Sequence, residues 1–141
     1  MKRIVGNIGA LALPNGKYAF GLIFKQSYVG FYKHFGDNEK DLPIDDDYVF
    51  ILSVHREVIS AMKLVGKKTI KDPKEVEPPP QCIVDPFTRK CKLYVNGEIR
   101  PSTYDECKDL EICACWELRH ITDRLMGNNE WQGYLGRPKP E

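Results

Sequence analysis

Large apolar residues alternate with smaller or polar ones along the first half of the chain, which is the two-residue period of a β-strand. The alternation is clearest over residues 18–24, where the large side chains fall on one face. Asn15-Gly16 stands just before this run, and Asn-Gly favours a type I′ turn because both central residues of that turn need positive φ. The pattern predicts a hairpin that joins residues 11–13 to residues 18–24.

Further strands are predicted at residues 28–33, 48–54 and 63–68. Residues 48–54 are apolar on both faces, which is typical of a central strand that is covered on each side. Between the last two strands, residues 55–62 place apolar side chains at helical spacing. We expect a short helix there.

The second half begins with a proline-rich segment, residues 71–81, which contains Pro73 and the run Pro78-Pro79-Pro80. Consecutive prolines favour extended polyproline geometry and exclude helix. The segment is therefore predicted to be a semi-rigid connector. Asn96-Gly97 follows further on and indicates a second hairpin after the strand-like residues 92–95.

Two helices and one more strand are expected near the C-terminus. Thr103 and Glu106 fit a capping box, which predicts a short helix that starts there. Residues 112–116 have the composition of a short buried strand. From Leu118 to Leu125 apolar residues recur at helical spacing, which predicts an amphipathic helix.

Together these elements indicate an α+β fold with a largely antiparallel β-sheet and a few short helices. The regular alternation of strand and helix that marks a parallel α/β fold is lacking. A chain of 141 residues fits one domain, and either side of the proline-rich segment alone is small for an independent core. We expect a single α+β domain over residues 1–127 and a polar C-terminal tail over residues 128–141.

Charge and hydropathy narrow the classes of partner. The net charge is +1, so the chain lacks the basic excess with which proteins bind phosphates, and direct nucleic-acid binding is not expected. No apolar run approaches the ~20 residues of a membrane span. Glycine and asparagine interrupt the apolar stretch of the first ten residues, unlike a signal peptide. We expect a cytoplasmic protein without membrane contact; the sequence leaves its oligomeric state open.

Catalytic and metal-binding patterns are incomplete. The chain has neither a Gly-x-Ser-x-Gly elbow nor a full phosphate-binding loop. One alternative is a small enzyme or metal-binding protein that uses Cys113, Cys115 and His120. Structural zinc sites prefer Cys-x-x-Cys spacing and a fourth ligand, for which Cys82 and Cys91 are the candidates. We prefer reduced cysteines that act as small buried hydrophobes, with Cys113 and Cys115 on one strand face. We expect no catalytic residue, no metal and no cofactor.

Carboxylates gather in one polar loop, at Asp37, Glu39, Asp41, Asp45, Asp46 and Asp47. A solvated loop explains such a run, whereas a calcium loop lacks the spacing and closing glutamate of an EF-hand. A third interpretation is a docking surface for a basic partner, because clustered negative charge steers such a partner toward it. Tyr48 beside the loop, with His34 and Phe35 before it, would then supply the central anchor of the interface.

Two stretches of the chain carry a resemblance to a known family. The first is residues 9–21, with the sequence GALALPNGKYAFG. The second contains, in order, Pro78-Pro79-Pro80, Asp85-Pro86, Tyr94-Val95-Asn96-Gly97-Glu98-Ile99-Arg100-Pro101, Glu106-Cys107, Leu110-Glu111, Trp116 and Asp123-Arg124-Leu125. In order and spacing these motifs resemble the immunity protein 26 family of bacterial polymorphic-toxin and contact-dependent inhibition systems.

The resemblance implies a cytoplasmic, non-enzymatic protein that binds and neutralises a cognate toxin, which in such systems is often a nuclease. The shared motifs look like fold-defining positions rather than an active site. Two departures stand out, since cysteines occupy residues 113 and 115 where small apolar residues are usual, and the acidic loop is not part of the pattern. We therefore expect Asp37, Glu39, Asp41, Asp45, Asp46, Asp47 and Tyr48 to be the toxin-interface candidates.

Overall fold

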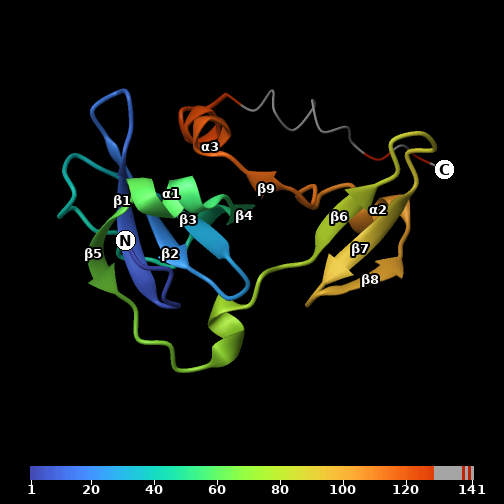
Figure 1. Cartoon of the computed structure of the whole chain (residues 1–141), viewed down its shortest axis with the longest axis horizontal. Coiled ribbons are helices and arrows are strands. Elements are labelled where there is room, and N and C mark those ends of the chain that lie inside the picture. Colours follow the sequence, from blue (N-terminus) through green and yellow to red (C-terminus); the bar gives the residue numbers. More distant parts are fainter. Residues whose placement is uncertain (129–137, 139, 141) are drawn as a thin grey trace.

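Two β-sheets organise the residues that the computed structural model describes, which are 1–128, 138 and 140. The six-stranded sheet has the order β5-β1-β2-β3-β4-β9 and the three-stranded sheet the order β6-β7-β8 (Figure 1). The strands are β1 (Asn7–Ala12), β2 (Tyr18–Ile23), β3 (Tyr28–Gly36), β4 (Tyr48–Val54), β5 (Lys63–Lys67), β6 (Gln81–Val84), β7 (Cys91–Val95), β8 (Glu98–Pro101) and β9 (Cys115–Trp116). The helices are α1 (Arg56–Ala61), the 3-10 turn η1 (Pro73–Val76), α2 (Tyr104–Cys107) and α3 (Leu118–Leu125).

The predicted α+β class and its antiparallel character are confirmed. Every strand pair is antiparallel except β4 with β9, which runs parallel through Ser53 and Val54. The predicted domain over residues 1–127 falls on described residues. Most of the predicted tail, residues 128–141, lies outside them.

The two Asn-Gly hairpins form, but with different turns. Between β7 and β8, Asn96 and Gly97 have φ of 50° and 81°, the paired positive values of a type I′ turn. Between β1 and β2, only Gly16 has positive φ, at 82°, and its N–H bonds the Leu13 carbonyl at 3.1 Å. This is a type I turn closed by a left-handed glycine, because Pro14 holds φ near the value that a type I turn requires. The type I′ prediction is therefore wrong for the first hairpin.

Large side chains fill both faces of the six-stranded sheet. On one face, α1 and α3 pack Val58, Ile59 and Ile121 against strand residues such as Phe31 and Leu52. The opposite face carries a cluster of aromatic and aliphatic residues that Val76 of η1 covers.

The proline-rich segment was predicted to lack helix, yet it forms the 3-10 turn η1. The Asp72 carboxylate caps this turn by accepting from the Lys74 N–H at 3.0 Å, and Pro73 fits its first position.

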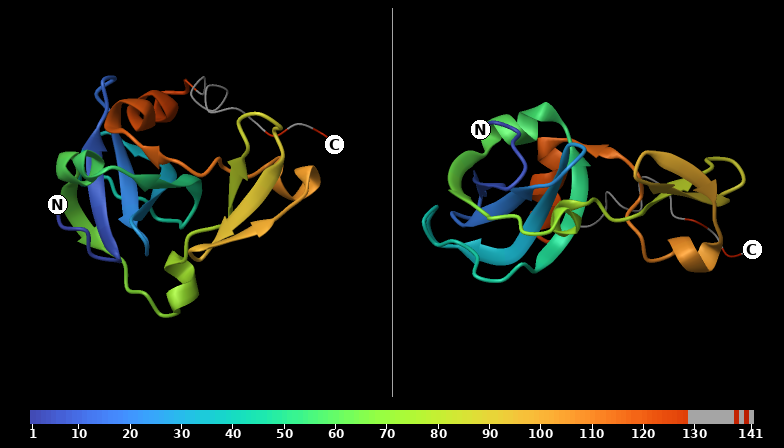
Figure 2. Two further views of the ribbon diagram at one scale, coloured as in Figure 1. Left: turned by 45° about the vertical axis from the view of Figure 1, so that its right-hand side comes forward. Right: turned by 90° about the horizontal axis from the view of Figure 1, so that it is seen from below.

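The three-stranded sheet has its own small core, made of Cys82, Cys91, Leu93, Cys107 and Ile112. Helix α2 lies against this sheet and begins at the predicted cap, where the Thr103 hydroxyl accepts from the Glu106 N–H at 3.3 Å. Figure 2 shows this sheet set to one side of the six-stranded sheet. In the part of the chain from residue 1 to residue 128, two segments join them, the proline-rich connector and the stretch that leads into β9.

Buried polar contacts fasten the two sheets to each other. The Tyr28 hydroxyl of β3 donates to Gln81 Oε1 at 3.1 Å, and Arg124 of α3 pairs with Glu111 at 2.6 Å. Glu111 belongs to the same stretch as Cys113, whose N–H bonds the Cys82 carbonyl of β6 at 2.7 Å. The Cys82 N–H bonds the Glu111 carbonyl at 2.8 Å, so the contacts of Gln81 and Glu111 lie side by side and join the three-stranded sheet to the first half at one place.

Two sequence predictions about buried strands need correction. Residues 112–116 were expected to form one buried strand, but only Cys115 and Trp116 pair with β4, and Cys115 is exposed. Because β9 is so short, it covers only one end of β4. The other end of β4 is uncovered, and Val49, expected to be covered, is 46% exposed.

Candidate functional site

The predicted acidic loop connects β3 to β4, and most of its carboxylates pair with basic side chains of this same chain. The lysine pairs are Asp37 with Lys17, Glu39 with Lys63 at 2.8 Å, Asp46 with Lys68, and Asp47 with Lys33 at 3.6 Å. His34 Nε2 lies 3.4 Å from Asp41 Oδ1 and 2.7 Å from the Asp41 carbonyl. These partners come from the β1–β2 hairpin, from β3 and from β5 and the residue after it, so they hold the loop against several strands from β5 to β3 of the six-stranded sheet.

These contacts reduce the charge that the loop presents. The hydrogen bond from Lys17 lowers the pKa of Asp37, and Asp37 in turn raises the pKa of Lys17. Both side chains are solvent-exposed, so the pair adds little to stability. Its main consequence is electrostatic, because a carboxylate beside an ammonium steers a basic partner less strongly than a lone carboxylate does.

The tip of the loop, residues 42–45, differs from the residues on either side of it in exposing apolar side chains. Ile44 is 95% exposed, although a large aliphatic side chain normally gains by leaving water. Asp45 next to it has no ion pair or hydrogen bond with any described residue. Leu42 is also partly exposed. Sequence reasoning passed over this apolar pair because the charged residues around it dominated the pattern, although Leu42-Pro43-Ile44 interrupts the run visibly.

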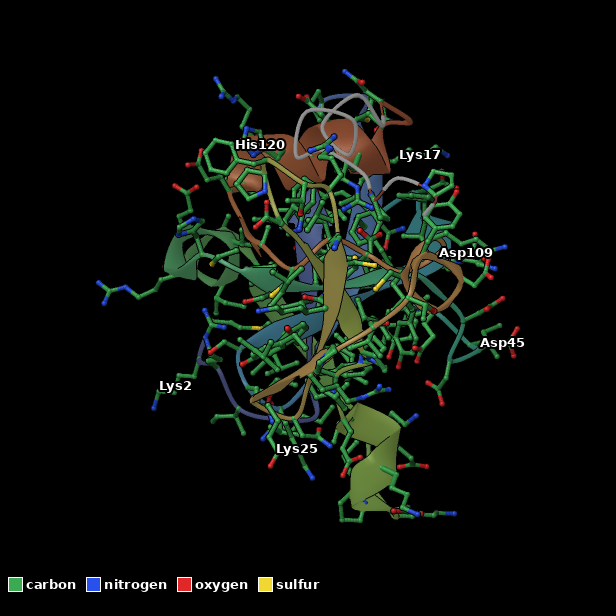
Figure 3. The ribbon with its side chains drawn as sticks, turned by 90° about the vertical axis from the view of Figure 1, so that its right-hand side faces the viewer. Lys2, Lys17, Lys25, Asp45, Asp109 and His120 are labelled. Atoms are coloured by element: carbon green, nitrogen blue, oxygen red, sulfur yellow. The ribbon has the colours of Figure 1, made fainter. Side chains whose placement is uncertain are left out.

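A groove extends the acidic surface onto the three-stranded sheet. Asp46 and Asp47 share a pocket of about 390 Å³ with Asp109 and Glu111. Apolar and proline residues complete its lining, namely Tyr48, Phe50, Ile51, Pro79, Pro80 and Leu110. Asp45 and Asp109 project on the same side of the molecule in Figure 3. Asp109 and Glu111 were not among the predicted site residues, since only the packing of the two sheets brings them to the loop.

The predicted aromatic anchor, Tyr48, is half-buried and packs against the cluster on one face of the six-stranded sheet. Its ring lies 4.9 Å from the ring of Tyr32 and 5.5 Å from that of Phe24, and its hydroxyl is buried. Burial raises the pKa of Tyr48. Tyr48 lines the groove without projecting from it. The role of Tyr48 as the interface anchor stays a prediction, and Ile44, at 95% exposed, is the more accessible apolar side chain.

Phe35 and Val49 line a second pocket, of about 490 Å³, at the uncovered end of β4. Arg124 forms its buried wall, with a side chain that is 2% exposed. The guanidinium lies 4.4 Å from the centre of the Phe50 ring and 4.6 Å from that of the Trp116 ring. Stacked between two rings and paired with Glu111, Arg124 serves the packing of α3 onto both sheets.

The alternative site of Cys113, Cys115 and His120 does not assemble. No group of three potential metal ligands among the described residues contains any of them. Cys115 is exposed on β9, and the His120 ring lies edge-on to Trp116 at 6.3 Å. Burial raises the pKa of the Cys113 thiol, which makes it a poorer nucleophile. The interpretation of Cys113 and Cys115 as buried small hydrophobes is wrong for Cys115.

A different set of thiols does come together. The Sγ atoms of Cys82, Cys91 and Cys107 lie within 4.8 Å of one another, and all three side chains are buried. These are also the buried cysteines of the three-stranded sheet's core. From the sequence, Cys82 and Cys91 were considered only as extra ligands for a metal site at Cys113. The reason is that the spacing of residues 82, 91 and 107 matches no known metal-binding motif.

Comparisons with protein-family models, with curated proteins and with solved structures found no match to this chain. The resemblance to immunity protein 26 therefore rests on the sequence motifs alone and stays a prediction. None of the helices in the described part of the chain is long and apolar enough to cross a membrane.

Proposed function

We propose that this chain is a non-enzymatic immunity protein that binds and neutralises a toxin protein, with the β3–β4 loop and the adjoining groove as its interface. The observation that carries the proposal is the exposure of Ile44, an apolar side chain that is 95% exposed and lies beside the unpaired Asp45. An apolar anchor ringed by carboxylates is the arrangement expected for docking onto a basic surface that has an apolar pocket.

The ion pairs around the loop support this use of it. Lys17, Lys63 and Lys68 hold carboxylates on both sides of the tip. A loop that is already ordered loses less conformational entropy when a partner binds, so more of the contact energy appears as affinity. The paired carboxylates thus act mainly as supports, and Ile44 and Asp45 are the groups left to contact a partner.

The groove supplies a second set of contacts for the same partner. Asp109 extends the acidic surface beyond the loop, whereas Glu111 is already paired with Arg124, and Pro79 and Pro80 give the groove rigid apolar walls. A nuclease toxin must hold phosphates and so has a basic active site. Carboxylates that occupy such a site form strong charge-assisted pairs with arginine and exclude the substrate.

The test is co-expression with the toxin gene that neighbours this one. The chain should rescue growth and form a stable complex with the toxin domain. Ile44→Ala should weaken the complex by about 2 kcal/mol or more, as expected of a hot-spot residue, mainly through faster dissociation. Phe87→Ala is a matched control, because Phe87 is comparably exposed, at 92%, but lies in the β6–β7 loop.

The charge contribution is measured separately, with Asp45→Asn combined with Asp109→Asn. Asp45, Asp46 and Asp47 changed together would also remove the pairs with Lys68 and Lys33, so the structure favours this narrower pair. Association should slow and depend less steeply on salt. Asp105→Asn with Glu98→Gln makes the same charge change outside the groove lining. If the complex tolerates Ile44→Ala and the groove variant behaves like its control, the toxin binds elsewhere.

A further inference from the structure

The thiol cluster of the three-stranded sheet is built from three separate elements. Cys82 comes from β6, Cys91 from β7 and Cys107 from the end of α2. They are 0%, 6% and 0% exposed, and their Sγ atoms lie within 4.8 Å of one another. Among residues 1–128, 138 and 140, this is the one group of three potential metal ligands so placed. The cluster takes no part in the interface proposed above.

The position of the cluster suggests that it does more than fill space. Among the described residues, Leu93 and Ile112 are the two that accompany the three cysteines as buried members of this core. Such a core buries little apolar surface, and small sheets with so thin a core are usually stabilised by a metal, a disulfide or a partner. None of the three is joined in a disulfide. They are also close enough to share one ion after a small inward movement.

We propose that Cys82, Cys91 and Cys107 bind one zinc ion as thiolates. In a tetrahedral site with zinc–sulfur bonds of about 2.3 Å, the sulfurs lie roughly 3.8 Å apart, so each Sγ moves by less than about 1 Å. Copper(I) also prefers thiolates, but three of them would leave a larger net negative charge around a monovalent ion than around Zn²⁺. Because burial penalises net charge, zinc is the better match.

The surroundings provide access, a fourth position and charge compensation. A pocket of about 510 Å³ opens onto Cys91 and Ser102, through which a water molecule can reach the ion as the fourth ligand. Lys90 and Lys92 line the same pocket together with the carboxylate Asp85, so the lining has a positive balance that offsets part of the negative charge of the thiolates. The Ser102 hydroxyl lies 3.5 Å from Cys107 Sγ, where it can donate to the thiolate once the metal has displaced the thiol proton.

The first test uses the intact, reduced chain. Elemental analysis of the purified protein should find about one zinc per chain. After the zinc is removed, titration with Co²⁺ should give the thiolate-to-cobalt charge-transfer band and the visible bands of a tetrahedral site, saturating at one equivalent. Zinc at about a thousandfold its Kd should raise the Tm by roughly 10 °C, while Mg²⁺ should not.

Variants then locate the ion. Cys107→Ser should abolish the cobalt thiolate band and the zinc-dependent rise in Tm. Cys113→Ser with Cys115→Ser should keep both signals, because these thiols lie outside the cluster. Circular dichroism shows whether Cys107→Ser is folded. If it is not, the titration of the unmodified chain still decides, since metal binding requires no variant.

Several results would overturn the proposal. One is a reduced chain that binds neither zinc nor cobalt at micromolar concentration. Another is a Cys107→Ser variant that retains the cobalt thiolate band, or a double variant at Cys113 and Cys115 that loses it. A stoichiometric disulfide within the cluster after anaerobic purification would assign these cysteines to a covalent bond instead.

Discussion

The six-stranded sheet buries large side chains on both of its faces, whereas three of the five buried core residues described for the three-stranded sheet are cysteines. Phe20, Phe31 and Leu52 are completely enclosed in the first, and each removes far more apolar surface from water than a cysteine does. In the second, Leu93 and Ile112 are the largest apolar side chains among the described buried residues of the core. Packing alone can therefore stabilise the first sheet. The second sheet also depends on its contacts with the first sheet and on any ligand that it binds.

The difference predicts where the molecule opens first. The three-stranded sheet is held by its thin core, by the Glu111–Arg124 and Gln81–Tyr28 contacts and, as proposed above, by a metal. Regions with few buried apolar contacts have the lowest local unfolding free energies. In the metal-free chain, we expect hydrogen exchange to be faster in β6–β8 than in β1–β4.

Truncating a buried side chain in each sheet should give the largest difference in the free energy of unfolding. Phe31→Ala should lower the free energy of unfolding by about 4 kcal/mol, because a buried phenylalanine leaves a large cavity. Leu93→Ala should cost about 2–3 kcal/mol and raise hydrogen exchange mainly in β6–β8. Urea denaturation and exchange mass spectrometry measure the two effects. Equal acceleration of exchange in both sheets by Leu93→Ala would mean that they unfold as one unit.

The contact between the sheets gives the next largest effect. Glu111→Gln should destabilise the protein by about 3 kcal/mol, because it leaves the buried Arg124 guanidinium without its counter-charge between Phe50 and Trp116. The matched control is Glu77→Gln. Glu77 pairs with Lys25 at 3.9 Å on the surface, so its loss should cost under about 1 kcal/mol. Similar urea midpoints for both variants would show that the inter-sheet pair contributes no more than a surface pair.

The same contrast separates what the sequence predicts from what it does not. Local patterns anticipated β2, β4 and α1, and the capping box at Thr103 placed α2. These elements depend on residue periodicity and short-range hydrogen bonds, which a linear reading can detect. Strand β6 was missed because it follows directly on the proline run and is only four residues long.

Prediction of the candidate site failed where contacts are distant in sequence. The acidic loop was recognisable as a charge cluster, but its pairing with Lys17, Lys63 and Lys68 depends on strand register. The thiol cluster depends on the packing of α2 against β6 and β7. The overlooked Ile44 is a different case, since its chemical contrast with the neighbouring aspartates was visible in the sequence.

Tyr28 tests the second link between the sheets and its response to pH. Tyr28→Phe removes the buried hydrogen bond to Gln81 and should cost about 1–2 kcal/mol at neutral pH. Burial raises the pKa of Tyr28 to about 12. The protonated form is therefore favoured on folding, so this stabilisation is complete below about pH 10 and is lost as the pH rises through about 12.

Urea titrations at pH 8 to 12 measure this dependence, and the curve for Tyr28→Phe should fall less steeply than that of the unmodified chain. Tyr18→Phe is the control, since the Tyr18 hydroxyl has no hydrogen bond with any described residue. Parallel curves for Tyr28→Phe and the unmodified chain would assign the alkaline loss of stability to other groups. Tyr32 and Tyr48 are those groups, since burial also raises their pKa values.

Substitutions in the two hairpin turns should have the smallest effect on stability. They compare one asparagine in a hairpin of each sheet. Asn96 has φ of 50°, a left-handed conformation that asparagine tolerates far better than alanine, so Asn96→Ala should cost about 1 kcal/mol. Asn15 lacks positive φ and contributes only the hydrogen bond that its Oδ1 accepts from the Lys17 N–H at 2.9 Å. Asn15→Ala should therefore cost about half as much. Because both residues precede a left-handed glycine, the sequence around them is closely matched, and urea midpoints report the difference in turn type. Equal costs would mean that the left-handed backbone at Asn96 carries no measurable strain for alanine.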